Sequence, residues 1–212
     1  MNNLFKTTNL SVNGIHYEDL SIKEGVSTFL SGPSGCGKST LLRLFNAALS
    51  PESGFIHYNG VDISSLDTIA LRKEVSLVTQ EVFLFNDSIA GNFREFYKYR
   101  EMPPPDEETM TRFLSICCLD MPLTADCSTL SGGEKQRVYI AIFLSLQPKV
   151  LLLDEPTSAL DSKNSDSILR SILDHCKEQG ITPIIISHDQ SLTEKFAESK
   201  IEFSKEGCKI NV

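Results

Sequence analysis

Ten residues early in the chain carry the pattern of a phosphate-binding loop. Residues 31–40 read Ser-Gly-Pro-Ser-Gly-Cys-Gly-Lys-Ser-Thr and fit the spacing G-x-x-x-x-G-K-[ST]. Glycines allow backbone N–H groups to turn inward and form a nest for an anion. Lys38 is long enough to reach the β- and γ-phosphates, and the Ser39 hydroxyl is a ligand suited to Mg²⁺. The stretch therefore predicts a site for a nucleoside triphosphate.

Two adjacent carboxylates follow an apolar run much later in the chain. Leu151-Leu152-Leu153 is followed directly by Asp154 and Glu155, and ligands of open α/β sheets bind at the carboxyl ends of strands. We expect Asp154 to hold Mg²⁺, directly or through water, and Glu155 to polarise the attacking water. Two acids in a solvated turn are the alternative, and the presence of the phosphate loop favours the catalytic interpretation.

A third motif combines a helix start with two glycines. Within Leu130–Arg137, Ser131 and Glu134 have the spacing of a capping box, so a helix is expected to begin here. A glycine-flanked helix start with a serine hydroxyl is also suited to binding an anion, although an ordinary capped helix would contain the same residues. Two phosphate-recognising ends far apart in one chain suggest two subunits that close over shared nucleotide.

The elements that must position these motifs alternate between strands and helices. Apolar runs at 26–30, 75–79, 150–153 and 181–187 predict buried strands with helices between them. Such an order favours an α/β fold with a mostly parallel sheet that is covered on both faces. The alternating apolar and polar residues of 4–30 predict paired antiparallel strands at the N-terminal end.

The middle of the chain differs in character from its two flanks. Residues 86–120 contain an aromatic cluster, a run of three prolines and then apolar residues at helical spacing, which indicates a helical insertion. We therefore expect a single domain over 1–212. In it, 1–85 and 147–212 form the core with the N-terminal β part, and 86–146 forms the helical subdomain that contains the third motif.

Composition limits the function classes. A chain of 212 residues with a net charge of −8 does not offer the basic face that a nucleic-acid partner requires, so no nucleic acid is expected. The six cysteines lack the spacing of metal ligands and are interpreted as reduced thiols in the cytoplasm. No apolar run approaches the length of a membrane span, so any membrane role is expected to depend on a partner.

The ordered set of motifs resembles that of the ATP-binding cassette (ABC) ATPases over nearly the whole chain. The matching segments are Ser31–Thr40 (Walker A), Gln80 (Q-loop), Leu130–Arg137 (signature motif), Val150–Pro156 (Walker B), Ser158–Asp161 (D-loop) and His188 (switch histidine). The resemblance implies a P-loop NTPase fold with a RecA-like core, ATP and Mg²⁺ as cofactors, and a head-to-tail dimer of two copies with two ATP molecules at the interface.

The resemblance also implies a role for each site residue. Catalysis is assigned to Glu155, His188 and Gln80, and Mg²⁺ binding to Ser39, Gln80 and Asp154. One subunit would contact ATP through Gly32, Pro33, Ser34, Gly35, Cys36, Gly37, Lys38, Ser39 and Thr40. The opposite subunit would contribute Ser131, Gly132, Gly133, Glu134 and Asp161. The aromatic residue that usually stacks on adenine is missing from its place near Asn13, and Tyr17 or His16 is the expected substitute.

Within the family the chain looks most like the small ATP-binding subunits of bacterial iron-export (FetA-like) transporters, on stretches such as 84–88 and 148–155. This implies an ATPase that powers substrate movement, with iron export as the finer expectation, through a separate transmembrane permease at the inner face of the cell membrane. One alternative is a soluble ABC ATPase of repair or translation. Another is a P-loop small-molecule kinase, which would leave the signature motif and His188 without a use.

The apolar segment Val82-Phe83-Leu84-Phe85 lies directly after Gln80. An apolar patch near the surface usually marks a protein interface, so this segment is the expected docking surface for the permease. The alternative is that these side chains fold inward onto Phe93 and Phe96 as ordinary core.

Overall fold

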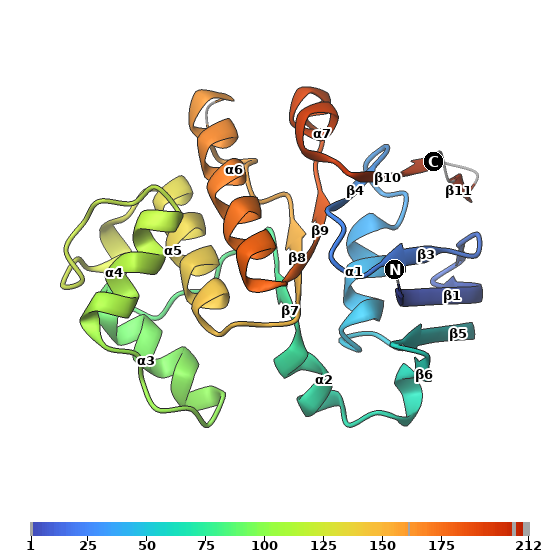
Figure 1. The fold of residues 1–212 in the computed structure, drawn as a ribbon, viewed down its shortest axis with the longest axis horizontal. Coiled ribbons are helices and arrows are strands. Elements are labelled where there is room, and N and C mark those ends of the chain that lie inside the picture. The colour runs from blue at the N-terminus through green and yellow to red at the C-terminus, as the bar shows by residue number, and fades with distance from the viewer. Residues whose placement is uncertain (1, 161, 205–206, 210–212) are drawn as a thin grey trace.

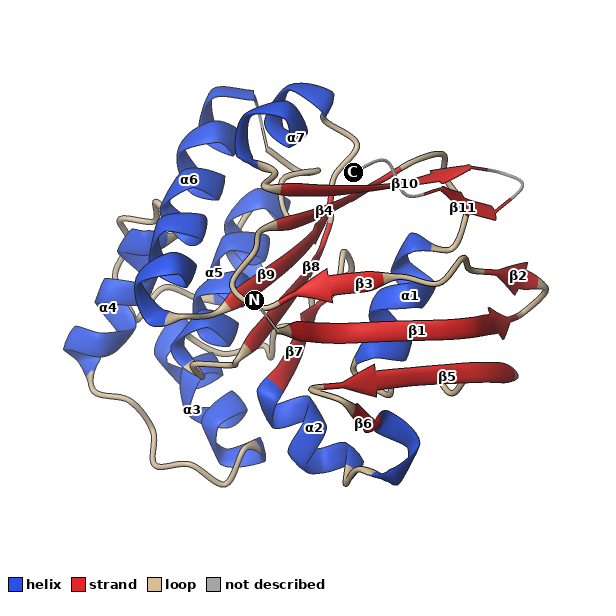
Figure 2. Cartoon of the chain, turned by 45° about the vertical axis from the view of Figure 1, so that its right-hand side comes forward, coloured by secondary structure: helices blue, strands red, loops and turns tan. Residues whose placement is uncertain are grey.

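The N-terminal β part forms an antiparallel sheet. The computed structural model describes residues 2–160, 162–204 and 207–209, and Figures 1 and 2 show how its elements are arranged. The sheet has the order β2-β1-β5-β6, with β3 paired to β1. Its strands are β1 (Asn3–Val12), β2 (Ile15–His16), β3 (Ser21–Lys23), β5 (Ser53–Tyr58) and β6 (Val61–Asp62).

The second sheet forms the centre of the molecule and has the order β11-β10-β4-β9-β8-β7. Its strands are β4 (Thr28–Ser31), β7 (Val75–Val78), β8 (Val150–Asp154), β9 (Thr182–Ile186), β10 (Ser199–Ser204) and β11 (Gly207–Lys209). All pairings from β10 to β7 are parallel, and β11 adds an antiparallel edge. This architecture confirms the predicted α/β class with a mostly parallel sheet and an antiparallel N-terminal part.

The residues of β8 alternate between two hydrophobic clusters, because successive strand side chains point to opposite faces of a sheet. Val150 and Leu152 join α1 (Lys38–Phe45) and the antiparallel sheet in one cluster. Leu151 and Leu153 join the helices on the other face in the second cluster. In Figure 2, α1 lies between the two sheets, so the helix that follows the phosphate loop is packed on both sides.

The remaining helices cover the other face of the central sheet or its edges. They are α2 (Thr68–Glu74), α3 (Ile89–Tyr99), α4 (Glu107–Ile116), α5 (Gly132–Ser145), α6 (Ser162–Gln179) and α7 (Gln190–Phe196), with short 3₁₀ turns at Ile63–Ser65 and Cys127–Thr129. In Figure 1, α3, α4 and α5 lie together at one end of the molecule, as expected for a helical insertion. The division into 1–85 with 147–212 and 86–146 stays a prediction.

The apolar segment 82–85 after Gln80 contains side chains in both expected environments, the exposed surface and the packed interior. Val82 and Leu84 pack against the helical cluster, whereas Phe83 is 59% exposed. Phe85 is half-buried and contacts both Phe83 and Phe96, with ring centroids 5.0 and 6.0 Å apart. The segment therefore has both inward-packed side chains and one exposed side chain, Phe83. Within the part of the chain that the structure describes, no helix has both the length and the apolar character needed to cross a bilayer.

Candidate nucleotide-binding site

The phosphate loop connects β4 to α1, as the sequence predicts. Gly32, Gly35 and Gly37 have φ angles of 138°, 79° and 99°, in the region that favours glycine. Two of these glycines also permit close contacts, because a Cβ on Gly32 would lie 2.4 Å from the Phe203 carbonyl oxygen and one on Gly37 would lie 2.7 Å from the Tyr17 hydroxyl. The loop conformation therefore requires glycine at both ends.

Lys38 lies across the loop at the start of α1. Its Nζ donates hydrogen bonds to the carbonyl oxygens of Gly32 and Pro33, each at 2.8 Å, and lies 3.6 Å from Cys36 Sγ. The residue is only 5% exposed, so its charge is held among loop dipoles rather than in bulk water. A phosphate in the loop would offer this ammonium group stronger, charged acceptors than two carbonyl oxygens.

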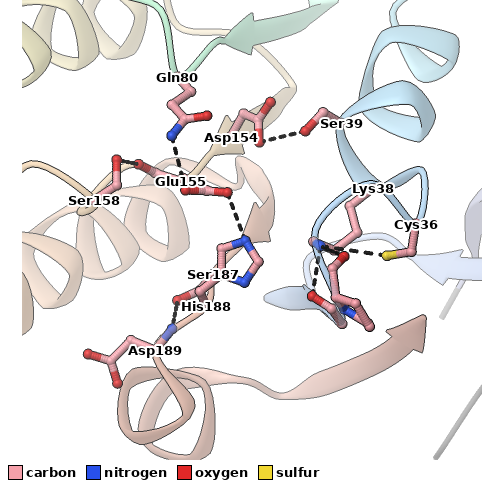
Figure 3. Close-up of polar contacts among 12 residues, drawn as sticks. Cys36, Lys38, Ser39, Gln80, Asp154, Glu155, Ser158, Ser187, His188 and Asp189 are labelled. Carbon is pink, nitrogen blue, oxygen red and sulfur yellow. Dashed lines mark hydrogen bonds and ion pairs between the residues drawn. The ribbon is translucent and has the colours of Figure 1, made fainter. Parts of the chain in front are cut away.

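A second pair of groups joins the loop to the end of β8. The Ser39 hydroxyl donates to Asp154 Oδ1 at 3.0 Å (Figure 3). Burial raises the pKa of the Asp154 carboxyl, and the hydrogen bond from Ser39 opposes part of that shift. The Ser39 hydroxyl and the buried Asp154 carboxyl group thus offer two oxygen ligands side by side at the loop. Oxygen ligands suit a hard cation such as Mg²⁺.

Glu155 is the centre of the polar contacts at this edge of the sheet. One carboxylate oxygen accepts a hydrogen bond from Gln80 Nε2 at 3.2 Å, and the other lies 2.9 Å from His188 Nε2 (Figure 3). Gln80 follows β7, Glu155 follows β8 and His188 follows β9, and these strands are neighbours. The three predicted catalytic residues therefore meet at the carboxyl edge of the parallel sheet, where ligands of such sheets bind.

The turn that carries Glu155 is held by its backbone. Glu155 has a φ of 52°, which is uncommon for a residue with a side chain. Its N–H donates to the Ile186 carbonyl, and its own carbonyl oxygen accepts from the Ser158 N–H and the Ser158 hydroxyl, at 3.2 and 3.0 Å. These contacts fix the direction in which the Glu155 side chain leaves the strand.

Gln136 is a contact to this turn that the sequence analysis missed. It lies on α5, is 2% exposed, and donates from Nε2 to the Glu155 carbonyl oxygen at 2.9 Å. Its Oε1 is buried and has no hydrogen-bond partner among the described residues. The helix that begins with the signature motif is therefore in direct contact with the Walker B turn. In the sequence Gln136 stands within the polar run Glu134–Arg137, and nothing there distinguishes it from its neighbours.

The signature motif forms the predicted capping box at the start of α5. The Ser131 hydroxyl donates to Glu134 Oε2 at 2.6 Å, and the Glu134 N–H donates to the Ser131 hydroxyl at 3.3 Å. The hydrogen bond from Ser131 lowers the pKa of Glu134. Ser131 and Gly132 are exposed, while a Cβ on Gly133 would lie 2.8 Å from Leu160. The buried residues of α5 belong to the helical cluster and those of α1 to the other cluster, so the helices that begin at the two motifs pack on opposite faces of the central sheet.

Tyr17, one of the two expected adenine-stacking residues, is buried beside the phosphate loop. Tyr17 is 4% exposed, its hydroxyl donates to the Gly37 carbonyl oxygen, and its ring packs edge-on against Phe203. A ring in that position has no open face for a base, so the expected stacking of Tyr17 on adenine does not fit the structure. His16 is exposed. Asp161, expected to contact the nucleotide of the opposite subunit, lies outside the described residues.

Two hollows border the predicted catalytic residues Glu155 and His188. One, of about 470 Å³, is lined by residues that include Gly32, His188 and Phe203. The other, of about 480 Å³, lies beside Glu155, Leu160 and His188. A larger cavity of about 520 Å³ lies between α4 and α6, and none of the predicted site residues lines it. The polar groups at the sheet edge, rather than cavity size, therefore locate the site.

Sequence comparison places the chain among known proteins. The profile of the family described as ABC transporter matches residues 15–158, which include the phosphate loop, the signature motif and the Walker B turn. The chain belongs to the ABC transporter family. This ABC cassette is 39% identical to the probable iron export ATP-binding protein FetA of Escherichia coli (strain K12), over 81% of the chain and 76% of the relative. It is 34% identical to the phosphonates import ATP-binding protein PhnC of Wolinella succinogenes, over 92% of the chain and 74% of the relative.

Solved ABC cassettes share the fold. CbiO1 from Clostridium perfringens, described as part of the ABC transporter complex cbiONQ, has a TM-score of 0.85 and 28% identity, covering 99% of this chain and 88% of that one. A dimeric post-hydrolysis state of the ATP-binding cassette MJ0796 bound to ADP and Pi has a TM-score of 0.82 and 25% identity, with coverage of 97% and 96%. The chain is thus an ABC ATPase, an ATP-binding subunit of the transporter type.

The buried Gln136 contact generates a prediction about the free energy of unfolding. Gln136→Met removes the donor to the Glu155 carbonyl oxygen, which keeps both donors from Ser158, and also removes the unpaired Oε1. We therefore expect urea unfolding to show a change of less than about 1 kcal/mol. Gln136→Glu has the same length but would place a carboxyl group in the same buried position, and should lose about 2 kcal/mol or more. Equal losses in both variants would contradict this account.

Proposed function

We propose that the chain hydrolyses ATP in a head-to-tail dimer of two copies and thereby drives transport through a separate membrane permease. The observation that carries the proposal is the position of Glu155, between Gln80 and His188 and next to the Ser39–Asp154 pair. This constellation would bring phosphate binding, cation binding and a carboxylate base to one edge of the sheet.

Phosphate binding is assigned to the loop and to the start of α1. Backbone N–H groups of residues 34–40 and the Lys38 ammonium group would hold the β- and γ-phosphates, since the positive end of a helix and a cationic side chain both favour anions. Ser39, Asp154 and Gln80 would hold Mg²⁺, which when bound neutralises charge on the phosphates. The contact between Ser39 and Asp154 at 3.0 Å supports that assignment for two of the three residues.

Water activation is assigned to Glu155. Its carboxylate would accept a proton from the attacking water, and Gln80 and His188 would hold the carboxylate and the water in line with the γ-phosphate. One carboxylate oxygen already contacts Gln80, and the other already contacts His188. Asp189 supports the position of His188, because its carboxylate accepts from the N–H groups of Ser191 and Leu192 and fixes the turn at the start of α7.

Dimer formation would complete the site. The start of α5, with Ser131, Gly132, Gly133 and Glu134, together with Asp161, would contact the nucleotide bound by the second copy. Ser131 and Gly132 are exposed and thus available to a second copy, which supports this arrangement. The structural likeness to a dimeric cassette supports it as well.

The permease would dock on a surface that we name the aromatic ledge, formed by Phe83, Phe85 and Tyr99. Phe83 and Tyr99 are 59% and 72% exposed, and Phe85 stacks on Tyr99 with ring centroids 6.1 Å apart. Phe83 and Phe85 of the ledge lie in the short segment that follows Gln80, and this segment would connect the γ-phosphate site to the ledge. Such a partner would place the chain in the cytoplasm at the inner face of the cell membrane.

The transported substrate and the direction of transport are the finer part of the proposal. We propose iron export, which the relative at 39% identity supports. A relative at 34% identity is described as a phosphonates importer, and none of the residues assigned above would touch a cargo. Copurification of the permease from native membranes, followed by transport assays with iron and with phosphonates, would decide between these directions.

The first prediction tests the role of Glu155. Glu155→Gln keeps the size of the side chain and removes the base, so ATP should still bind while turnover falls by about two to four orders of magnitude. The variant should accumulate as an ATP-bound dimer on size-exclusion chromatography. Glu52→Gln, at an exposed position, is the control and should hydrolyse ATP like the wild type. Hydrolysis at the wild-type rate by Glu155→Gln would exclude the assigned role.

The second prediction tests the head-to-tail arrangement. Ser131→Arg should abolish hydrolysis, because arginine would fill the space of the partner's phosphates, while the isolated monomer binds MgATP with unchanged affinity. Mixing it with Lys38→Ala should restore one of the two composite sites in each mixed dimer. Loss of MgATP binding by the Ser131→Arg monomer itself would show that Ser131 serves the nucleotide of its own subunit.

The third prediction tests the aromatic ledge. The double change Phe83→Asp with Tyr99→Asp alters two exposed side chains, so folding and MgATP binding should be retained. The fraction of protein that sediments with membranes prepared from its source should fall at least about fivefold, because charge disrupts an apolar contact. Phe55→Asp is the matched control, since Phe55 is 57% exposed and lies on β5. Equal sedimentation of both variants would argue against docking at the ledge.

A further inference from the structure

Tyr17 makes a buried contact with the end of the phosphate loop. Its hydroxyl donates to the Gly37 carbonyl oxygen at 2.9 Å, and the residue is 4% exposed. Its backbone is fixed as well, because the Tyr17 N–H donates to the Leu10 carbonyl of β1 at 2.9 Å. The contact therefore connects the antiparallel sheet to the residue that precedes α1.

The Gly37 carbonyl oxygen accepts two hydrogen bonds at the start of α1. Gly37 is the N-cap of α1 and has no side chain that could cap the helix. Its carbonyl oxygen accepts the first helical hydrogen bond, from the Leu41 N–H at 2.9 Å, and the Tyr17 hydroxyl is a second donor to it. The carbonyl of Gly37 and the N–H of Lys38 belong to one planar trans peptide and point in opposite directions. A donor that fixes the carbonyl therefore also fixes the direction of the Lys38 N–H.

The other end of the loop is held by a residue that touches Tyr17. β10 pairs with β4 in parallel, with Glu202 opposite Ser31, so the next residue, Phe203, lies beside Gly32. The fit is tight enough that a Cβ on Gly32 would lie 2.4 Å from the Phe203 carbonyl oxygen. The Phe203 ring is buried and packs edge-on against the Tyr17 ring, with centroids 6.3 Å apart. Two aromatic residues in mutual contact thus hold the first and the last glycine of the loop.

We propose that Tyr17 is a positioning residue for MgATP binding, which fixes the Gly37–Lys38 peptide, and with it the start of α1, in the orientation that receives phosphate. The inference rests on the ATP-binding assignment and gives Tyr17 a role through the backbone instead of through the base. Without the hydroxyl, Gly37 keeps its helical hydrogen bond, so the loop would fold but would sample more orientations before phosphate binds. Nucleotide binding would then have to order the loop, and this entropic cost would reduce the affinity for nucleotide.

Tyr17→Phe tests the proposal, because it removes the hydroxyl and keeps the ring against Phe203. The Kd for MgATP, measured by isothermal titration calorimetry, should rise about three- to tenfold, the usual effect of one intramolecular hydrogen bond. The loss in ATPase activity should appear mainly in KM. Amide hydrogen exchange of peptides that cover residues 31–45 should be faster than in the wild type without nucleotide.

Tyr97→Phe is the matched control. Tyr97 is 5% exposed and donates from its hydroxyl to the Ser145 carbonyl at 2.7 Å, between α3 and α5 and not at the loop. It should lose a similar amount of thermal stability, but should keep wild-type MgATP affinity and wild-type exchange at 31–45. The proposal is overturned if Tyr17→Phe binds MgATP and exchanges like the wild type, or if both variants change equally. Should the wild type not bind MgATP, the ATP assignment fails, while the exchange comparison still tests whether Tyr17 orders the loop.

Discussion

A strand buried on both faces cannot carry a charge along its length, because a charge without a partner is costly away from water. All five residues of β8 are buried, and its four apolar residues alternate between the two hydrophobic clusters. The carboxyl groups of Asp154 and Glu155 therefore stand where the strand ends. The neighbouring strands β7 and β9 end at the same edge, which brings Gln80 and His188 to Glu155. The arrangement of the site follows from this one constraint on burial.

The local motifs could be predicted from the sequence because each depends on residues close together in the chain. The phosphate loop and the capping box of Ser131 and Glu134 both formed as expected. The parallel sheet followed from the alternation of strands and helices. These predictions needed only local conformational preferences and hydrophobic pattern.

Three contacts could not be predicted, because each joins residues that are distant in sequence and lack a pattern of their own. Tyr17 was considered for stacking on adenine, and only its burial shows that its hydroxyl instead contacts Gly37. Gln136 was one of four consecutive polar residues, Glu134–Arg137, until its contact with Glu155 was visible. The position of Phe203 depends on the register of β10 against β4. The segment 82–85 contained both expected environments, which hydrophobicity alone does not resolve.

The pairing of β10 with β4 has a consequence for the order of folding. It joins residues that are about 170 positions apart, and Phe203 closes against Gly32 only when β10 is in place. During synthesis, the phosphate loop leaves the ribosome long before the strand that supports it. A growing chain that has reached the signature motif therefore contains all the glycines of the loop, but it does not yet contain β10 and the Phe203 that lies against Gly32. The contact that supports Gly32 is therefore among the last parts of the site that synthesis supplies.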